Sequence, residues 1–208
     1  MGMKKKMYLC GGKEVKSVIK ANGERLLANV LGGIPPSTER TQESKVERRK
    51  QLGERSRKNM TKEEKYQQVV PQIEALVAGE SDEIANMANV AAVLHETFGF
   101  WWTGFYRVEG NELVLGPFQG PVACTRIPFG RGVCGTAWAQ NKTIVVPNVH
   151  DFIGHIACSS ISKSEIVVPV RKDGEIVAVL DIDSAEYNTF DATDQAYLER
   201  IVLIPLRG

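Results

Sequence analysis

The chain has 208 residues, 43% of them hydrophobic and 25% charged, which is typical of one soluble globular domain with an appendage. No apolar run approaches the roughly 18 residues of a membrane span, and four cysteines are too few for a disulfide-stapled secreted domain, so we expect a cytoplasmic protein. The net charge of +1 hides two regions of opposite sign. Residues 1–59 carry 15 basic and 6 acidic side chains, which leaves 11 basic and 19 acidic ones in residues 60–208.

The basic region, residues 1–59, has one aromatic side chain and loop signals at Gly32-Gly33 and Pro35-Pro36. It lacks the apolar surface for a core of its own, so we expect a disordered extension. Its charge would suit nucleic acid or a targeting receptor. A solvated extension, or sequence upstream of a true start at Met60, explains the composition more simply, so nucleic acid is not an expected partner. Cys10 lies in this region.

The first expected elements after Met60 are two helices and a hairpin. The capping-box pattern Thr61-Lys62-Glu63-Glu64 opens a helix that Pro71 should restart before Gly79 ends it. Apolar residues at helical spacing predict a second helix over residues 81–98. Strands are expected over residues 100–108 and 112–118, joined by a turn between them.

The remaining pattern continues with a short helix over residues 132–140, a strand over 143–147 and a loop over 148–164. Residues 165–171 and 175–182 form the clearest hairpin, around Asp173-Gly174. Asp191 should cap a last helix that ends near Pro205. This order predicts an α+β domain with a mainly antiparallel sheet and helices packed on one face.

Three cysteines, Cys124, Cys134 and Cys158, lie in separate glycine- or alanine-rich stretches. Thiol redox chemistry needs a thiolate and a second thiol to clear its oxidised product. Taken alone, a loop cysteine such as Cys158 is more often inert, and Cys124 reads as a small buried hydrophobe. Cys134 enters a helix, whose N-terminus can lower a thiol pKa. A zinc site with His150 and His155 competes, but no Cys-x-x-Cys pair occurs, so we expect no metal.

Carboxylates are the second candidate group. Strand alternation puts Asp181 and Asp183 on one face, and Glu165 lies on the neighbouring strand. Crowded and partly buried carboxylates should have raised pKa values, so one could stay protonated and donate a hydrogen bond while another binds an ammonium group. His155 is a candidate base, and a hydrogen bond that orients its loop is an equal alternative.

Aromatic residues complete the candidate set. Trp102 and Tyr106 are four residues apart on a strand and therefore share a face. By pattern alone such a pair is more often core than pocket. Trp101, on the opposite face, is a core candidate.

Together these motifs resemble the free methionine-(R)-sulfoxide reductases, a single-domain branch of the GAF fold. The match runs from about Met60 to about Val202, so residues 60–208 would be a GAF-like catalytic domain. The N-terminal extension and an early end to the last helix depart from the family pattern. The matching stretches are residues 102–106, 115–120, 127–128, 130–137, 154–158, 164–167 and 179–184.

The resemblance implies a role for each cysteine. Cys158 would attack the sulfoxide sulfur, release methionine and become a sulfenic acid, and Cys124 would resolve it through a Cys124–Cys158 disulfide. Cys134 would be an alternative nucleophile or a second relay. Thioredoxin or a similar dithiol would recycle the disulfide without a cofactor, and a homodimer is possible.

The resemblance also implies a substrate pocket. Glu165 and Asp183 would lie near the sulfoxide and Asp181 nearer the amino group, with Trp102 and Tyr106 as an aromatic wall around the methyl group. The alternative is a GAF-type module that senses a small ligand or an oxidant without turnover. A sensor would need an effector domain, and none is recognisable in the sequence.

Overall fold

The computed structural model describes residues 60–156 and 159–205 of the chain. The predicted disorder of residues 1–59 therefore concerns residues outside the described part and stays a prediction. Six strands of the described part form one antiparallel sheet in the order β3-β2-β1-β6-β5-β4. The strands are β1 (Trp102–Glu109), β2 (Glu112–Gln119), β3 (Arg126–Pro128), β4 (Ile144–Val146), β5 (Ser164–Lys172) and β6 (Glu175–Ser184).

Helix α3 (Lys62–Val77) begins at the expected capping box, where Thr61 accepts from the Glu64 backbone and Glu64 binds back to Thr61. The predicted restart at Pro71 is wrong, because α3 runs through this proline without a break. A proline removes the backbone N–H that would bind the carbonyl four residues earlier, that of Gln67. Pro71 and Gln67 are both exposed, so water can take the place of the missing donor.

Helix α4 (Glu83–Phe98) begins at Asp82, whose side chain accepts from the Ala85 backbone, and ends at Gly99 in the left-handed conformation. Helix α5 (Gly132–Gln140) and helix α6 (Ala192–Ile201, capped by Asp191) agree with the predicted segments. A short 3-10 turn, η1 (Val149–Asp151), interrupts the predicted loop. No helix in the described part is long and apolar enough to cross a membrane.

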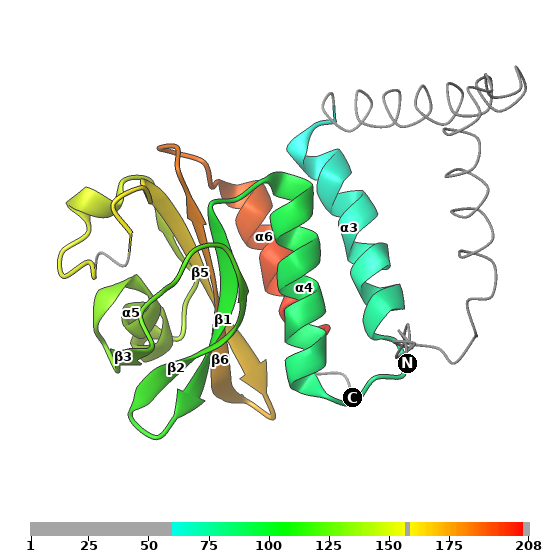
Figure 1. Ribbon diagram of the computed structural model, residues 1–208, viewed down its shortest axis with the longest axis horizontal. Coiled ribbons are helices and arrows are strands. Elements are labelled where there is room, and N and C mark those ends of the chain that lie inside the picture. The colour runs from blue at the N-terminus through cyan, green and yellow to red at the C-terminus, as the bar shows by residue number, and fades with distance from the viewer. Residues whose placement is uncertain (1–59, 157–158, 206–208) are drawn as a thin grey trace, which may run out of the picture. The chain divides into compact units, whose positions relative to one another are not determined.

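The sheet separates two apolar layers (Figure 1). Helices α4 and α6 pack on one face, α3 packs against these two helices, and the three bury the main core around Leu180, Ile182 and Ile166. The short helix α5 lies on the opposite face, against β5 and β6. The expected α+β class with an antiparallel sheet is confirmed, and α5 is the element that creates a second, smaller layer in which a site can form.

Strand β3 was not predicted from the sequence. It has three residues, of which only Ile127 is buried, and this is too short for a recognisable strand pattern. It adds an edge to β2 and leads directly into α5. The predicted 165–171 and 175–182 hairpin is correct and somewhat longer than expected, as β5 and β6.

Candidate active site

The sheet register lines up the predicted pocket residues across three strands. Glu165 on β5 lies opposite Asp183 on β6, and Asp183 lies opposite Trp102 on β1. Residues opposite one another in a sheet project to the same face. Ile182 points the other way and is fully buried in the main core, as alternation predicts.

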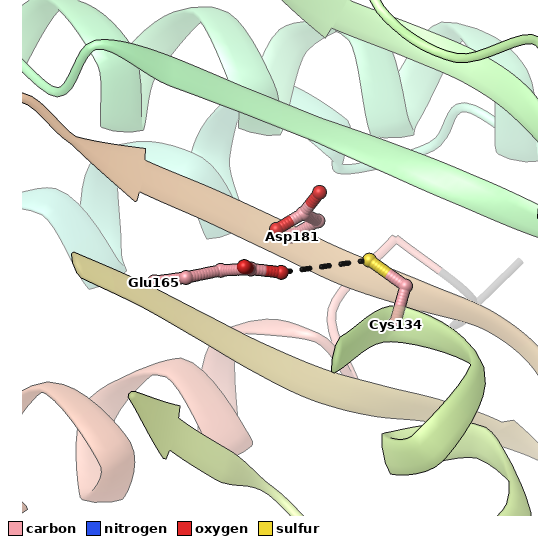
Figure 2. A group of neighbouring side chains, drawn as sticks. All are labelled: Cys134, Glu165 and Asp181. Atoms are coloured by element: carbon pink, nitrogen blue, oxygen red, sulfur yellow. Dashed lines mark hydrogen bonds between the residues drawn. The ribbon is translucent and has the colours of Figure 1, made fainter. Parts of the chain in front are cut away.

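Helix α5 brings Cys134 against this face. The Sγ atom of Cys134 lies 3.9 Å from Oε1 of Glu165, and the side chain is only 3% exposed. Figure 2 shows Cys134, Glu165 and Asp181 converging from α5, β5 and β6. Gly135, the next residue, lets α5 pack tightly against the end of β3, since a Cβ there would lie 2.6 Å from the Pro128 carbonyl oxygen.

Burial and mutual repulsion favour the protonated forms of these carboxyl groups. Burial, and then the neighbouring charges of Asp181 and Asp183, raise the pKa of Glu165 well above its usual range. Burial and the charge of Asp183 raise the pKa of Asp181 in the same way. Protonated carboxyl groups are hydrogen-bond donors, so the pocket can present acidic O–H groups at neutral pH.

The Cys134 thiol shows that these effects outweigh the helix terminus. Cys134 is near the N-terminus of α5, which favours a thiolate. Burial, and then the charges of Asp181 and Glu165, nevertheless raise its pKa well above the usual range. Burial and the nearby carboxyl groups therefore oppose the lowering of the thiol pKa that a helix N-terminus can provide, and Cys134 is a buried, free cysteine.

Asp183 is the most accessible of the three carboxylates. Burial raises its pKa to about 6, although a hydrogen bond from Ser162 opposes the rise. Ser162 is itself buried and lines the pocket, and it could not be predicted because a serine within a loop is common. The pKa of Asp183 therefore lies close to neutral pH, and the pKa values of Glu165 and Asp181 are raised well above their usual ranges.

Trp102 and Tyr106 both line the pocket. Their ring centroids are 5.9 Å apart, and Trp102 also stacks on Phe118 at 5.4 Å. Gly104 lies between them on β1, and a Cβ at that position would lie 2.4 Å from the Trp102 ring. Gly104 is thus required for this position of the Trp102 ring, and a glycine within a strand does not by itself predict such a contact.

The same two aromatic residues hold the segment that contains Cys124. Trp102 Nε1 donates to the Pro121 carbonyl at 3.1 Å, and the Tyr106 hydroxyl donates to the Cys124 carbonyl at 2.9 Å. Cys124 is disulfide-bonded, whereas Cys134 is a free thiol, so Cys134 is not its partner. Cys158, the predicted nucleophile, lies outside the described residues.

Trp101 is not a core residue, contrary to expectation. It precedes β1, so strand alternation does not set its direction, and its side chain is half-buried at the pocket. Its Nε1 atom donates to Ser159 Oγ at 3.3 Å, which ties it to the loop before β5.

His155 reaches the pocket from the predicted loop. Its Nε2 atom lies 3.9 Å from Oε2 of Glu165. Burial, and to a lesser extent the charge of His150, lower the pKa of His155, so its ring is neutral at pH 7. A neutral ring beside a protonated carboxyl group is a polar contact rather than an ion pair.

These residues line one pocket that opens to solvent, and the space between them amounts to about 580 Å³ when the opening is included. Six predicted site residues line it, and the Cys124 segment borders it through Pro121, Val122 and Ala123. The six are Trp102, Tyr106, Cys134, Glu165, Asp181 and Asp183. A small ligand in it would meet an aromatic wall on one side and carboxyl groups on the other.

Comparison with known proteins identifies the domain family of this chain. The model of the GAF domain family matches residues 81–203, which include every strand of the sheet. A GAF domain-containing protein A of Dictyostelium discoideum is 61% identical over 143 residues, which are 68% of this chain and 90% of that protein. The chain belongs to the GAF domain family.

Other relatives identify the branch of the GAF domain family to which the chain belongs. A free methionine-R-sulfoxide reductase of Escherichia coli is 47% identical over 144 residues, which are 69% of this chain and 87% of that protein. The structure of the free methionine-R-sulfoxide reductase of Neisseria meningitidis in complex with its substrate is 57% identical, with a TM-score of 0.67. That similarity covers 68% of this chain and 86% of the other. The chain belongs to the free methionine-R-sulfoxide reductase family.

Proposed function

We propose that the protein reduces free L-methionine (R)-S-oxide to L-methionine by thiol chemistry in this pocket. The observation that carries the proposal is the group of carboxyl groups with raised pKa values facing an aromatic wall. A sulfoxide oxygen is a hydrogen-bond acceptor that gains negative charge as its sulfur is attacked. Protonated carboxyl groups can donate to it, and this assists the attack.

The substrate would use both sides of the pocket. Its methyl group would lie against Trp102 and Tyr106, which offer rigid apolar surface. Its sulfoxide oxygen would lie near Glu165 and Asp183, which are opposite each other in the register, and would accept from the protonated Glu165. The Oδ1 atom of Asp181 is buried without a hydrogen-bond partner among the described residues, so it can accept from the substrate ammonium group.

The chemistry would proceed in three balanced steps. The Cys158 thiolate attacks the sulfoxide sulfur, the oxygen takes a proton from a pocket carboxyl group, and its transfer leaves methionine and a Cys158 sulfenic acid. The carboxyl group regains its proton from solvent. The Cys124 thiol then displaces water from the sulfenic acid and forms a Cys124–Cys158 disulfide. A cytoplasmic thioredoxin or similar dithiol reduces this disulfide and is itself oxidised.

Cys134 would have a supporting role. Its raised pKa makes it a poor nucleophile, which favours Cys158 for the attack. The disulfide-bonded state of Cys124 agrees with a resolving thiol, and the hydrogen bonds from Trp102 and Tyr106 would fix its position relative to the pocket.

The proposal is tested first by the choice of epimer. Purified protein is supplied with thioredoxin, thioredoxin reductase and NADPH, and methionine is measured for each sulfoxide epimer. The (R) epimer should be reduced and the (S) epimer should not, because inversion exchanges the oxygen and the methyl group between carboxyl groups and rings. Binding without methionine formation would instead indicate a sensor, and equal turnover of both epimers would exclude the pocket geometry.

Single-turnover measurements on serine variants separate the cysteines. Cys158→Ser should release no methionine, whereas Cys124→Ser should release about one equivalent, because attack precedes the disulfide. Turnover with thioredoxin should then fail in Cys124→Ser. If Cys134→Ser rather than Cys158→Ser eliminates the first methionine, the assignment of the nucleophile is wrong.

A further inference from the structure

The pocket floor contains three donor atoms of a kind that bind soft metal ions. The Cys134 Sγ atom, one Glu165 oxygen and one Asp181 oxygen all lie within 4.8 Å of one another, and all three residues are buried. Each comes from a different element of the fold, α5, β5 and β6, so the group is held by packing rather than by one flexible loop (Figure 2).

A second observation points to a missing positive charge. The Oδ1 atom of Asp181 has no hydrogen-bond partner among the described residues, although Asp181 is only 6% exposed. Asp181 also lines the pocket, so this oxygen belongs to a group that a ligand can reach. The described residues that line the pocket include three carboxylates but neither lysine nor arginine. A buried oxygen in such a place is a vacant acceptor for a cation.

We propose that Cys134, Glu165 and Asp181 bind a soft divalent cation, Zn²⁺ or Cd²⁺, and that the bound ion blocks the pocket. The ion would displace the Cys134 proton to solvent on binding, and the resulting thiolate sulfur with carboxylate oxygen suits this class of ion. Mg²⁺ and Ca²⁺ instead favour six or more oxygen ligands. Neighbouring donors in a tetrahedral zinc site lie roughly 3.5 Å apart, which follows from Zn–S and Zn–O lengths. The three donors therefore need to approach one another by about 1 Å. The fourth position faces the pocket.

This site is inhibitory and differs from a structural zinc site made of cysteines and histidines. It occupies the oxygen of Asp181 that the substrate ammonium group would otherwise use. Metal binding itself does not depend on the proposed function, whereas inhibition of turnover rests on it.

The binding test uses the full chain with Cys124 in its disulfide, so that this thiol does not compete. Cd²⁺ is titrated and sulfur-to-cadmium charge-transfer absorption is recorded in the ultraviolet. We expect a one-to-one signal that disappears in Cys134→Ser and is unchanged in the matched control Cys10→Ser. Glu165→Gln and Asp181→Asn should weaken Cd²⁺ binding by about tenfold or more, which is about 1.4 kcal/mol. Thermal melting without metal verifies that each variant is folded.

The outcome that overturns the site is a charge-transfer signal that persists in folded Cys134→Ser, or one that Cys10→Ser abolishes. Unchanged Cd²⁺ affinity in both carboxylate variants would also overturn it. The blocking role is tested on the same oxidised protein, in which no turnover occurs. Free methionine sulfoxide should displace Cd²⁺ and reduce the absorption, and joint occupancy would contradict the block.

Zn²⁺ inhibition of turnover tests the block under catalytic conditions. With thioredoxin as reductant, Zn²⁺ should raise the apparent KM for methionine sulfoxide and leave kcat unchanged. Unchanged KM at a Zn²⁺ concentration that saturates the site would exclude the block. A protein that binds Cd²⁺ through Cys134 but makes no methionine even without metal would retain the metal site and lose the proposed function.

Discussion

The two faces of strand β6 differ in what burial does to stability. On the helix side, Leu180 and Ile182 are fully buried among apolar side chains, and each stabilises the fold by about 1.5–3 kcal/mol. On the pocket side, Asp181 and Asp183 are buried as carboxyl groups that resist ionisation, which costs stability at neutral pH. One strand thus contributes stabilising apolar side chains to the core on one face, and carboxyl groups that lower the stability of the fold at neutral pH on the other.

The largest expected effect is on the helix side. Ile182→Ala should lower the free energy of unfolding by about 2–5 kcal/mol, because it removes buried methyl groups and leaves a cavity in the main core. Urea denaturation measures this change. A loss below about 1 kcal/mol would show that the helix layer collapses around the cavity and that the two faces are less different than their packing indicates.

A smaller loss is expected on the pocket side from Gly104→Ala. The new methyl group would lie 2.4 Å from both the Trp102 ring and Phe118 Cβ, so we expect a loss of about 1–3 kcal/mol. The ring must also move, so KM for the substrate should rise. Gly110→Ala is the control, because nothing lies within 4 Å of its Cβ, although its left-handed φ of 63° costs about 1 kcal/mol. Equal KM values in both variants would contradict a packing role for Gly104.

Much of this fold was predictable from local signals. The capping boxes at Thr61 and Asp191 and the Asp173-Gly174 turn define their elements in the sequence itself. Alternation also placed Asp181 and Asp183 together and Ile182 opposite. The short strand β3 was missed, because its pairing with β2 depends on tertiary contacts rather than on its own three residues.

The site was less predictable where several elements meet. Trp101 was assigned to the core because alternation was extended beyond the first residue of β1. The Cys134 thiol was expected to benefit from the helix terminus, but its pKa depends on carboxylates from β5 and β6, which lie far away in the sequence. Gly104 and Ser162 carry no chemical signal of their own and act only through Trp102 and Asp183.

Asp183→Asn should raise the free energy of unfolding, whereas Ile182→Ala should lower it. The pKa of Asp183 rises from its ordinary 3.8 to about 6 on folding, so the folded state holds its proton more tightly than the unfolded state. The stability from this proton is fully present below pH 3.8 and is lost as the pH rises through about 6. Asp183→Asn cannot ionise, so at pH 7.5 it should be more stable than the wild type by on the order of 1–2 kcal/mol.

Melting temperatures from pH 4 to pH 8 measure this effect. The difference between Asp183→Asn and the wild type should grow across the range and level off above about pH 7, while catalytic efficiency of the variant falls. Ser184→Ala, next to Asp183 but not among the pocket residues, is the control and should show no such pH dependence. A constant difference at all pH values would mean that Asp183 does not titrate with a raised pKa.

The smallest expected effect compares one hydrogen bond on each side of the sheet. The hydroxyl of Tyr106 donates to the Cys124 carbonyl on the pocket side, and that of Tyr66 donates to the buried Asp194 on the helix side, both at 2.9 Å. Tyr106→Phe and Tyr66→Phe should each lower the free energy of unfolding by about 1 kcal/mol. Only Tyr106→Phe should slow the step that follows the first methionine, roughly fivefold, because only it loosens the Cys124 segment. Rapid-quench counting of methionine and of free thiols resolves the two steps. If both variants form the disulfide at the wild-type rate, the Tyr106 hydroxyl stabilises the fold without positioning Cys124, and the pocket side has the same structural role as the helix side at this point.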